Sequence, residues 1–180
     1  MKKALIVFLT FIFLVGCTVA TTSSSPTKVV ERLLGKYQSL NEEVIKQLNQ
    51  VLDSQNITKE QKKEYRDLMK KQYQNLTYNI KKETIDDETA VVSVEIEVFN
   101  FAKANNETEV YVSGHEEDFL DDNNQLSDVL YQNYKIDQLK NVKERTKYTL
   151  DLSLTKEDDI WKLDELSDME RQKIHGLYDL

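Results

Sequence analysis

The residue types that could carry out chemistry are few in this chain of 180 residues. There is one cysteine, Cys17, and there are two histidines, His115 and His175. A metal site needs several convergent nitrogen, oxygen or sulfur ligands, and no HExxH pattern surrounds either histidine. We interpret His115 as part of a solvated helical face, sharing it with Asp118 or Phe119. We place His175 near the end of a helix, where a cationic imidazole would suit the helix dipole. The sequence therefore predicts no metal and no cofactor.

Adjacent aspartates are the other candidates for chemistry, because paired carboxylates can do acid–base work or bind calcium. They occur at 86–87, 121–122 and 158–159. Each pair falls where a turn is expected, and aspartate favours turns for backbone reasons. The chain has no EF-hand spacing, nucleophile elbow, phosphate loop or glycine-rich dinucleotide motif. We therefore predict that this protein is not an enzyme.

Cys17 ends a segment with the features of an export signal. Lys2 and Lys3 give a cationic start, and residues 4–15 form an apolar run that is shorter than the roughly 20 residues a bilayer span needs. The run ends in Leu-Val-Gly-Cys, which resembles the lipobox of bacterial lipoproteins. The resemblance implies a signal peptide over 1–16, removed by cleavage, and a diacylglycerol on the sulfur of Cys17. It also implies a protein held on the extracytoplasmic face of the cell membrane.

The residues after Cys17 predict a flexible tether followed by one domain. Residues 17–25 are small and polar and show no periodicity, and we assign 26–180 to a single domain of ordinary size. Removing the two leader lysines takes the formal net charge from −8 to about −10. A chain this acidic repels nucleic acid phosphates, so we exclude nucleic acid as a partner and expect membrane contact through the lipid alone.

The hydrophobic periodicity predicts three helices and then a hairpin. Helices are expected to begin at Ser25-Pro26, at Asn41 and at the capping box that opens at Thr58. The period then changes to two, with the clearest strand over 92–98, where apolar residues alternate with Ser and Glu. In this first half of the chain, helices therefore precede an antiparallel pair of strands.

The second half predicts an insert, a second hairpin and a last helix. We expect 101–146 to be mainly helical, with a helix from about Phe101 to Leu120 and another toward Val142. Val110, Tyr111 and Val112 could instead form a short strand, but the surrounding Glu, Ala and Lys residues favour the helix. Alternation resumes at Tyr148, and a capping box at Ser167 starts a helix that reaches about Tyr178. The fold class is therefore α+β, with N-terminal helices packed on a curved antiparallel sheet.

A second resemblance rests on two segments of the chain, KVVERLLGKYQSL near the start and YTLDLSLTKEDDIWKLDEL near the end. N-terminal helices followed by an antiparallel sheet resemble the nuclear transport factor 2-like, or cystatin-like, superfamily. In particular, the chain is similar to small lipoproteins of low-GC Gram-positive bacteria that carry such a domain. The resemblance covers about 120 residues, and the insert departs from it. It implies a cone-shaped interior in which Tyr78, Tyr148 and Trp161 could line a pocket. The hypothesis is a non-catalytic module that binds an envelope protein or a small-molecule ligand. One alternative is an enzyme with acid–base residues in the cone, and another is a purely structural surface protein.

Overall fold

The computed structural model describes residues 25–179, so the predicted leader, Cys17 and most of the tether lie outside the described residues. The helices are α1 Pro26–Gln38, α2 Glu42–Ser54, α3 Lys59–Gln74, α4 Phe101–Gly114, the 3₁₀ helix η1 Glu116–Phe119, α5 Asp128–Asn141 and α6 Asp168–His175; the strands are β1 Thr77–Asp86, β2 Thr89–Phe99, β3 Arg145–Glu157 and β4 Ile160–Leu163. The chain is α+β, which confirms the predicted class. Within residues 25–179, no helix combines the length and apolar character needed to cross a membrane.

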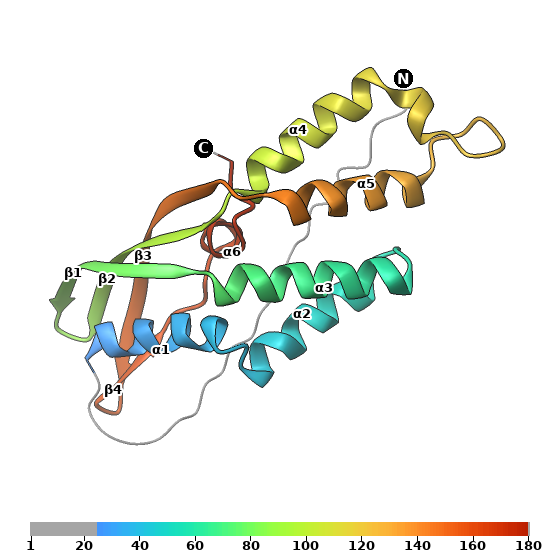
Figure 1. The fold of residues 1–180 in the computed structure, drawn as a ribbon. Helices are drawn as coiled ribbons and strands as arrows, with labels where there is room; N and C mark the ends of the chain where they lie inside the picture. The colour runs from blue at the N-terminus through green and yellow to red at the C-terminus, as the bar shows by residue number, and fades with distance from the viewer. Residues whose placement is uncertain (1–24, 180) are drawn as a thin grey trace.

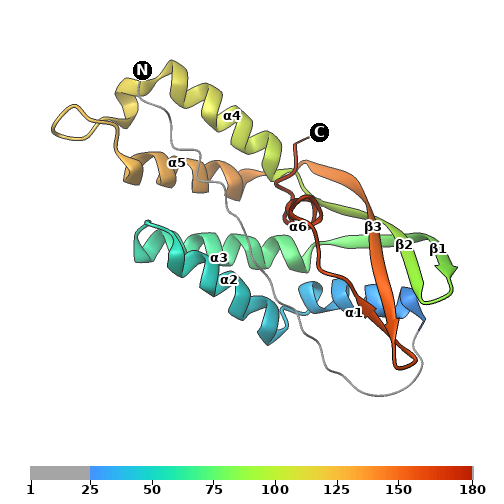
Figure 2. The same cartoon turned by 180° about the vertical axis from the view of Figure 1, so that it is seen from behind.

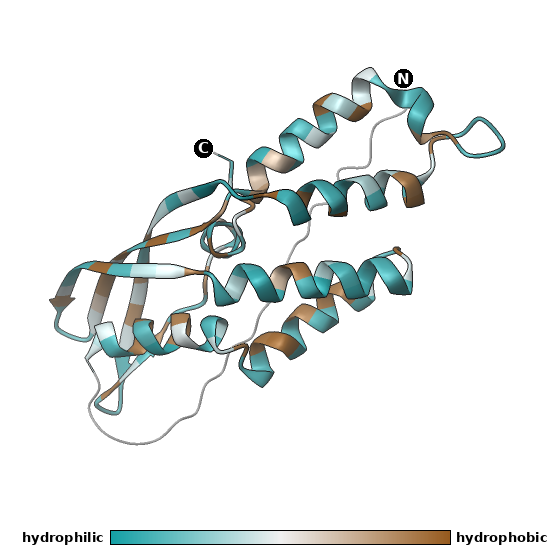
Figure 3. Ribbon diagram, in the orientation of Figure 1, coloured by the Kyte–Doolittle hydropathy of each residue, from teal (hydrophilic) through white to brown (hydrophobic). Residues whose placement is uncertain are grey.

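The four strands form one open antiparallel sheet in the order β1-β2-β3-β4. The central strand β2 alternates strictly, with Ala90, Val92, Val94, Ile96 and Val98 buried and the residues between them more exposed (Figure 3). This alternation gives the sheet one apolar face and one wet face, as expected for an antiparallel sheet covered on one side. Helices α1, α3 and α6 all contact the sheet, and their apolar stripes complete a continuous core.

The helix starts predicted from capping residues are confirmed. The side chains of Ser25, Asn41 and Thr58 each accept a hydrogen bond from the first turn of α1, α2 and α3. The capping boxes at Thr58 and Ser167 are complete, with the reciprocal bond from the third helical residue in place. These contacts satisfy backbone donors that the first turn of a helix cannot pair internally.

Two predicted helix ends are wrong. The helix expected over 101–120 stops at Gly114, and a separate 3₁₀ turn covers Glu116–Phe119. The last helix stops at His175 rather than near Tyr178, because Gly176 takes a left-handed conformation with φ of 72° and caps it.

The helices α4 and α5 form a hairpin inserted between two paired strands. Strands β2 and β3 pair along their whole length, up to the partners Phe99 and Arg145. The chain leaves the sheet at Phe99, runs out along α4, and returns along α5 to Arg145 (Figures 1 and 2). We call residues 101–142 the α4–α5 hairpin. It extends away from the sheet beside α3, which α5 contacts.

The buried carboxamide of Gln72 joins three elements where the hairpin leaves the sheet. Its Oε1 accepts a hydrogen bond from the backbone N–H of Phe99 at 2.9 Å, and its Nε2 donates to the carbonyls of Phe99 at 3.0 Å and His175 at 2.9 Å. The side chain is fully buried, so each of these bonds satisfies a group that water cannot reach. Gln72 therefore fixes α3, the end of β2 and the end of α6 against one another.

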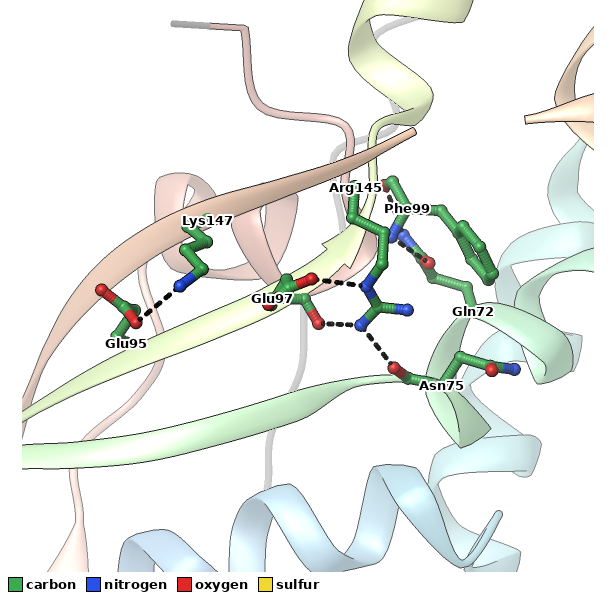
Figure 4. Close-up of polar contacts among 7 residues, drawn as sticks. All are labelled: Gln72, Asn75, Glu95, Glu97, Phe99, Arg145 and Lys147. Atoms are coloured by element: carbon green, nitrogen blue, oxygen red, sulfur yellow. Dashed lines mark hydrogen bonds and ion pairs between the residues drawn. The ribbon is translucent and has the colours of Figure 1, made fainter. Parts of the chain in front are cut away.

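Arg145 makes a second junction on the wet side of the same place (Figure 4). Its guanidinium donates to the Glu97 carboxylate at 2.9 Å, to the Glu97 carbonyl at 2.8 Å and to the Asn75 carbonyl at 2.7 Å. It also lies 5.3 Å from the centre of the Phe99 ring, a cation–π geometry. The base of the hairpin is closed by the Asn100 N–H, which donates to the Glu144 carbonyl at 2.9 Å.

We predict that Gly176→Ala destabilises the fold. A Cβ at this position would lie 2.2 Å from both Gln72 Nε2 and the Phe99 carbonyl oxygen, and the left-handed φ is unfavourable for alanine. The free energy of unfolding, measured with urea, should fall by at least about 2 kcal/mol. Gly35→Ala in α1 is the control, because no atom lies within 4 Å of its added Cβ, and it should raise stability by about 0.5–1 kcal/mol. An equal effect of the two substitutions would contradict this account.

Candidate functional site

His175 is buried and neutral, so the predicted cationic imidazole at the helix end is wrong. The side chain is 3 % exposed, and its Nδ1 lies 3.0 Å from the hydroxyl of Tyr73. Burial, with a smaller contribution from the nearby charge of Arg171, lowers the pKa of His175 to about 4. Burial also raises the pKa of Tyr73 well above its usual value. The pair is an uncharged hydrogen-bonded contact inside the core.

His115 lies far from this pair, at the exposed end of α4. It caps the helix, so it does not share a helical face with Asp118 or Phe119 as predicted. Its ring stacks on Tyr111 with 4.1 Å between centroids, and its Nδ1 lies 2.9 Å from the Tyr111 carbonyl. Among residues 25–179, no group of three or more histidine, cysteine, aspartate or glutamate side chains could hold a metal ion.

The aspartate pairs occupy the turns predicted for them. Asp87, Asp158 and Asp159 have positive φ values of 49°, 49° and 63° at the tips of the two β-hairpins, a conformation that aspartate tolerates. The carboxylate of Asp121 accepts the backbone N–H groups of Asn123 and Gln125 at 2.8 and 3.0 Å. These side chains shape the backbone of their own loops.

The three aromatic residues proposed as pocket lining are not gathered in one place. Tyr78 and Tyr148 flank Ile96 in a single row across the sheet. The Tyr148 hydroxyl donates to the Tyr178 carbonyl at 2.6 Å, so its polar end is satisfied. Trp161 pairs with Lys156, eight residues farther along β3, which is about 26 Å of strand. The role of these residues in lining a pocket stays a prediction.

The cavity nearest the interior is small. It lies between α1, α2 and the segment after β4, with Tyr37, Val44, Leu166 and Arg171 among its lining residues, and its volume is about 50 Å³. That volume admits a few water molecules and is well below the roughly 300 Å³ at which pockets for organic ligands begin. The covered face of the sheet is therefore filled by side chains at this point.

A larger open groove of about 370 Å³ lies between α4 and α5. It is lined from α4 by Ala104, Glu107, Thr108 and Tyr111, and from α5 and its end by Tyr134, Gln138, Asn141 and Val142. Spacings of three and four residues place each set on one face of its helix. The groove therefore forms where the facing side chains of the two antiparallel helices do not fill the space between them.

Aromatic rings fix one end of this groove. Tyr111 and Tyr134 stack across it with 5.0 Å between centroids. The Phe119 ring meets the edge of Tyr134 at 5.3 Å, and Phe119 itself is buried. The η1 turn thus folds back to anchor the stack, and His115 extends it on the outer side. Pairs of this kind add about 0.5–1.5 kcal/mol each beyond their buried area, so this wall of the groove is well ordered.

Exposed apolar side chains concentrate on the same hairpin. Of the nine large hydrophobic residues exposed in the described chain, five lie between 110 and 130: Val110, Tyr111, Leu126, Val129 and Leu130. We call these five the apolar patch. Val110 is 72 % exposed and Leu126 58 %, and Figure 3 shows brown segments along α4 and at the start of α5. A single exposed apolar residue needs no explanation, whereas five on one helical hairpin favour an interaction site.

The hairpin is also strongly acidic. Residues 101–142 contain nine acidic residues and three lysines, a net charge of −6. Lys103 pairs with Glu144 outside the hairpin, and Lys140 pairs with Glu64 on α3 and with Asp137. Asp137 is the only acidic residue of the hairpin in an ion pair within the described part of the chain. Lys103 and Lys135 also interact electrostatically with Glu107 and Glu109, respectively, without forming ion pairs with them. The hairpin that carries the apolar patch nevertheless keeps its net charge of −6.

Reading the sequence missed the groove, although it identified both helices. The signal was present as Val110, Tyr111 and Val112 in α4 and Val129 and Leu130 in α5, apolar residues beside runs of acidic ones. The surrounding composition predicts the first helix and the apolar periodicity the second, but the gap depends on how two helices separated by residues 115–127 pack together.

We predict that His175 makes stability fall between about pH 6.5 and pH 4. The unfolded imidazole takes up a proton in this range and the buried one does not, so the unfolded state gains stability as the pH falls. The free energy of unfolding should drop by about 2–3 kcal/mol from pH 7 to pH 4.5 through this group. His175→Gln should remove that part of the drop, whereas His115→Gln, at an exposed position, should keep it. Matching pH profiles for the wild type and His175→Gln would show that His175 is not the cause.

Comparison with known proteins adds no relative to this description. No protein-family model matches the chain, and neither the curated proteins nor the solved structures give a match. The functional argument therefore rests on the sequence and the geometry of the α4–α5 hairpin.

Proposed function

We propose that this protein is a non-catalytic partner-binding module of the cell envelope, and that the α4–α5 hairpin is its binding surface. The observation that carries the proposal is the apolar patch beside the groove. Val110 is 72 % exposed and Leu130 41 %, and each Å² of apolar surface left in water forgoes about 25 cal/mol of burial free energy. A partner that covers them recovers that free energy.

The positions of the cavities support a binding site on the surface of the hairpin rather than in the interior of the domain. The covered face of the sheet is packed with a continuous apolar core, and the cavity beside it holds a few waters at most. His175, the buried group best suited to acid–base chemistry, is neutral and bonded to Tyr73. The open groove and the exposed apolar residues lie on the hairpin instead.

The proposal includes the cellular location inferred from the first 25 residues. The leader over 1–16 directs export, Cys17 carries lipid, residues 17–25 form a tether, and 26–180 form one domain on the extracytoplasmic face of the cell membrane. Two acyl chains on one cysteine suffice for stable anchoring where one would be marginal. The relationship to the nuclear transport factor 2-like superfamily belongs to the same proposal, supported by helices followed by an antiparallel sheet.

The proposed binding surface can be tested by photo-crosslinking in the host cell. A photoreactive amino acid at Val110 or at Leu130 should give a discrete adduct with another protein, because both side chains project into solvent from the hairpin. The same probe at Ile85, which is 52 % exposed on β1, is the matched control and should give no such adduct. Adducts are resolved by gel and their mass determined.

Three outcomes would reject the proposed surface. One is the absence of adducts at both hairpin positions, and another is the same adducts from Ile85. The third is an adduct whose mass equals two copies of this chain, which would make the hairpin a surface for self-association.

The anchor is tested separately with Cys17→Ala. Because Cys17 is the only thiol, the substitution should abolish incorporation of labelled palmitate. It should also release the protein from membranes or leave it unprocessed. Ser23→Ala in the tether is the control and should keep both the label and the membrane fraction. Undiminished palmitate incorporation by Cys17→Ala would disprove lipidation at this residue.

A further inference from the structure

We infer that the partner segment held by the α4–α5 hairpin is a cationic amphipathic helix, with its apolar side on the Tyr111–Tyr134 stack and the exposed apolar residues, and its basic residues beside the acidic groove and rim. The inference rests on the proposed function and adds the chemistry of the partner. It follows from three properties of the hairpin: the shape of the groove, the apolar residues on its margins, and the net charge around it.

The shape favours a helix as the occupant. The groove runs between two antiparallel helices, and a third helix packs between two others by placing its apolar side chains in the gap. Val110 and Leu130 are not lining residues of the groove. Each lies about one turn along its helix from a residue that is, Glu107 for Val110 and Tyr134 for Leu130, so helical spacing places exposed apolar side chains near the groove on both helices. The stacked Tyr111 and Tyr134 provide a rigid aromatic wall, and aromatic residues are common anchors at interfaces.

The charge favours a basic partner. The hairpin has a net charge of −6, and eight of its nine acidic residues form no ion pair within the described chain. Glu107 lines the groove itself, while Glu116, Glu117 and Asp118 follow at the end of α4. Complementary charge raises the association rate and disfavours partners of like charge.

The same charge argues against other occupants. A second copy of this hairpin would bring a second net charge of −6 to the contact. Anionic lipid headgroups would be repelled in the same way. A basic segment with one apolar side, by contrast, matches both the groove and its rim.

The test uses the full chain carried in phosphatidylcholine nanodiscs, with the signal of empty nanodiscs subtracted. The probe is a fluorescent 14-residue helix with leucine at helical spacing on one side and lysine on the other. Binding measured by anisotropy should be saturable, and at least about tenfold tighter than that of a peptide of the same composition in scrambled order. Raising the salt concentration should weaken it.

Paired variants locate the binding. The double variant Val110→Ser and Leu130→Ser should weaken binding of the probe by about tenfold or more, since both apolar margins of the groove are lost. Ile85→Ser and Ile160→Ser, on the exposed strands β1 and β4, remove the same number of exposed apolar side chains elsewhere and should leave the affinity unchanged. Glu107→Gln should weaken binding less than the double variant and reduce its dependence on salt.

Several results would overturn the inference. Absence of saturable binding, equal binding of the scrambled peptide, equal binding of a leucine–glutamate helix, or equal loss in both double variants would each do so. Failure here is distinguishable from failure of the proposed function. If the hairpin crosslinks to another protein in cells but the leucine–lysine helix does not bind, the hairpin remains the binding surface. The chemistry inferred for its partner is then wrong.

Discussion

The buried side chain of Gln72 sets the constraint on which the rest of the structure depends. A carboxamide with no exposure must find partners for its donors and its acceptor, because leaving one unpaired costs about 1–3 kcal/mol. Here the partners are backbone groups of Phe99 and His175. These hydrogen bonds therefore fix the relative positions of helix α3, the end of β2 and the end of α6. Gly176 is part of it, because any side chain there would occupy the space of the Gln72 amide.

That junction also determines where the hairpin begins. Phe99 is the last residue of β2, and α4 starts two residues later. With both the N–H and the carbonyl of Phe99 held by Gln72, and with Arg145 held by Glu97 and Asn75, the two connections to the sheet are fixed. The base of the hairpin belongs to the core through Phe101 and Leu139. Its outer half is held to α3 by the buried Gln61 side chain, which donates to the Val129 carbonyl at 3.1 Å and to Asn133 Oδ1 at 2.7 Å, and it carries the apolar patch.

Local rules predicted most of the elements, because capping residues and periodicity act over a few positions. The starts at Ser25, Thr58 and Ser167 follow from side chains that satisfy neighbouring backbone groups. The predictions that were wrong concern residues whose environment is set by contacts with parts of the chain distant in sequence. His175 lies at a helix end, where local reasoning expects a charge, but packing against Tyr37 and Tyr73 removes it from water and keeps it neutral.

The groove could not be predicted for a related reason. Its two walls come from helices joined through a 3₁₀ turn and a loop, and the width between them depends on how Phe119 folds back against Tyr134. The sequence alone places both helices and their exposed residues, but it does not give the distance between them.

The position of α1 has a consequence for how the domain would stand on a membrane. The backbone N–H of Thr27 donates to Glu83 near the turn between β1 and β2, so the chain enters at the end of the sheet that holds the β-turns. The α4–α5 hairpin projects from the other end (Figure 1). If Cys17 carries lipid, as proposed, the anchor would join the domain at its turn-bearing end, and the groove would lie at the end of the domain opposite the point of attachment.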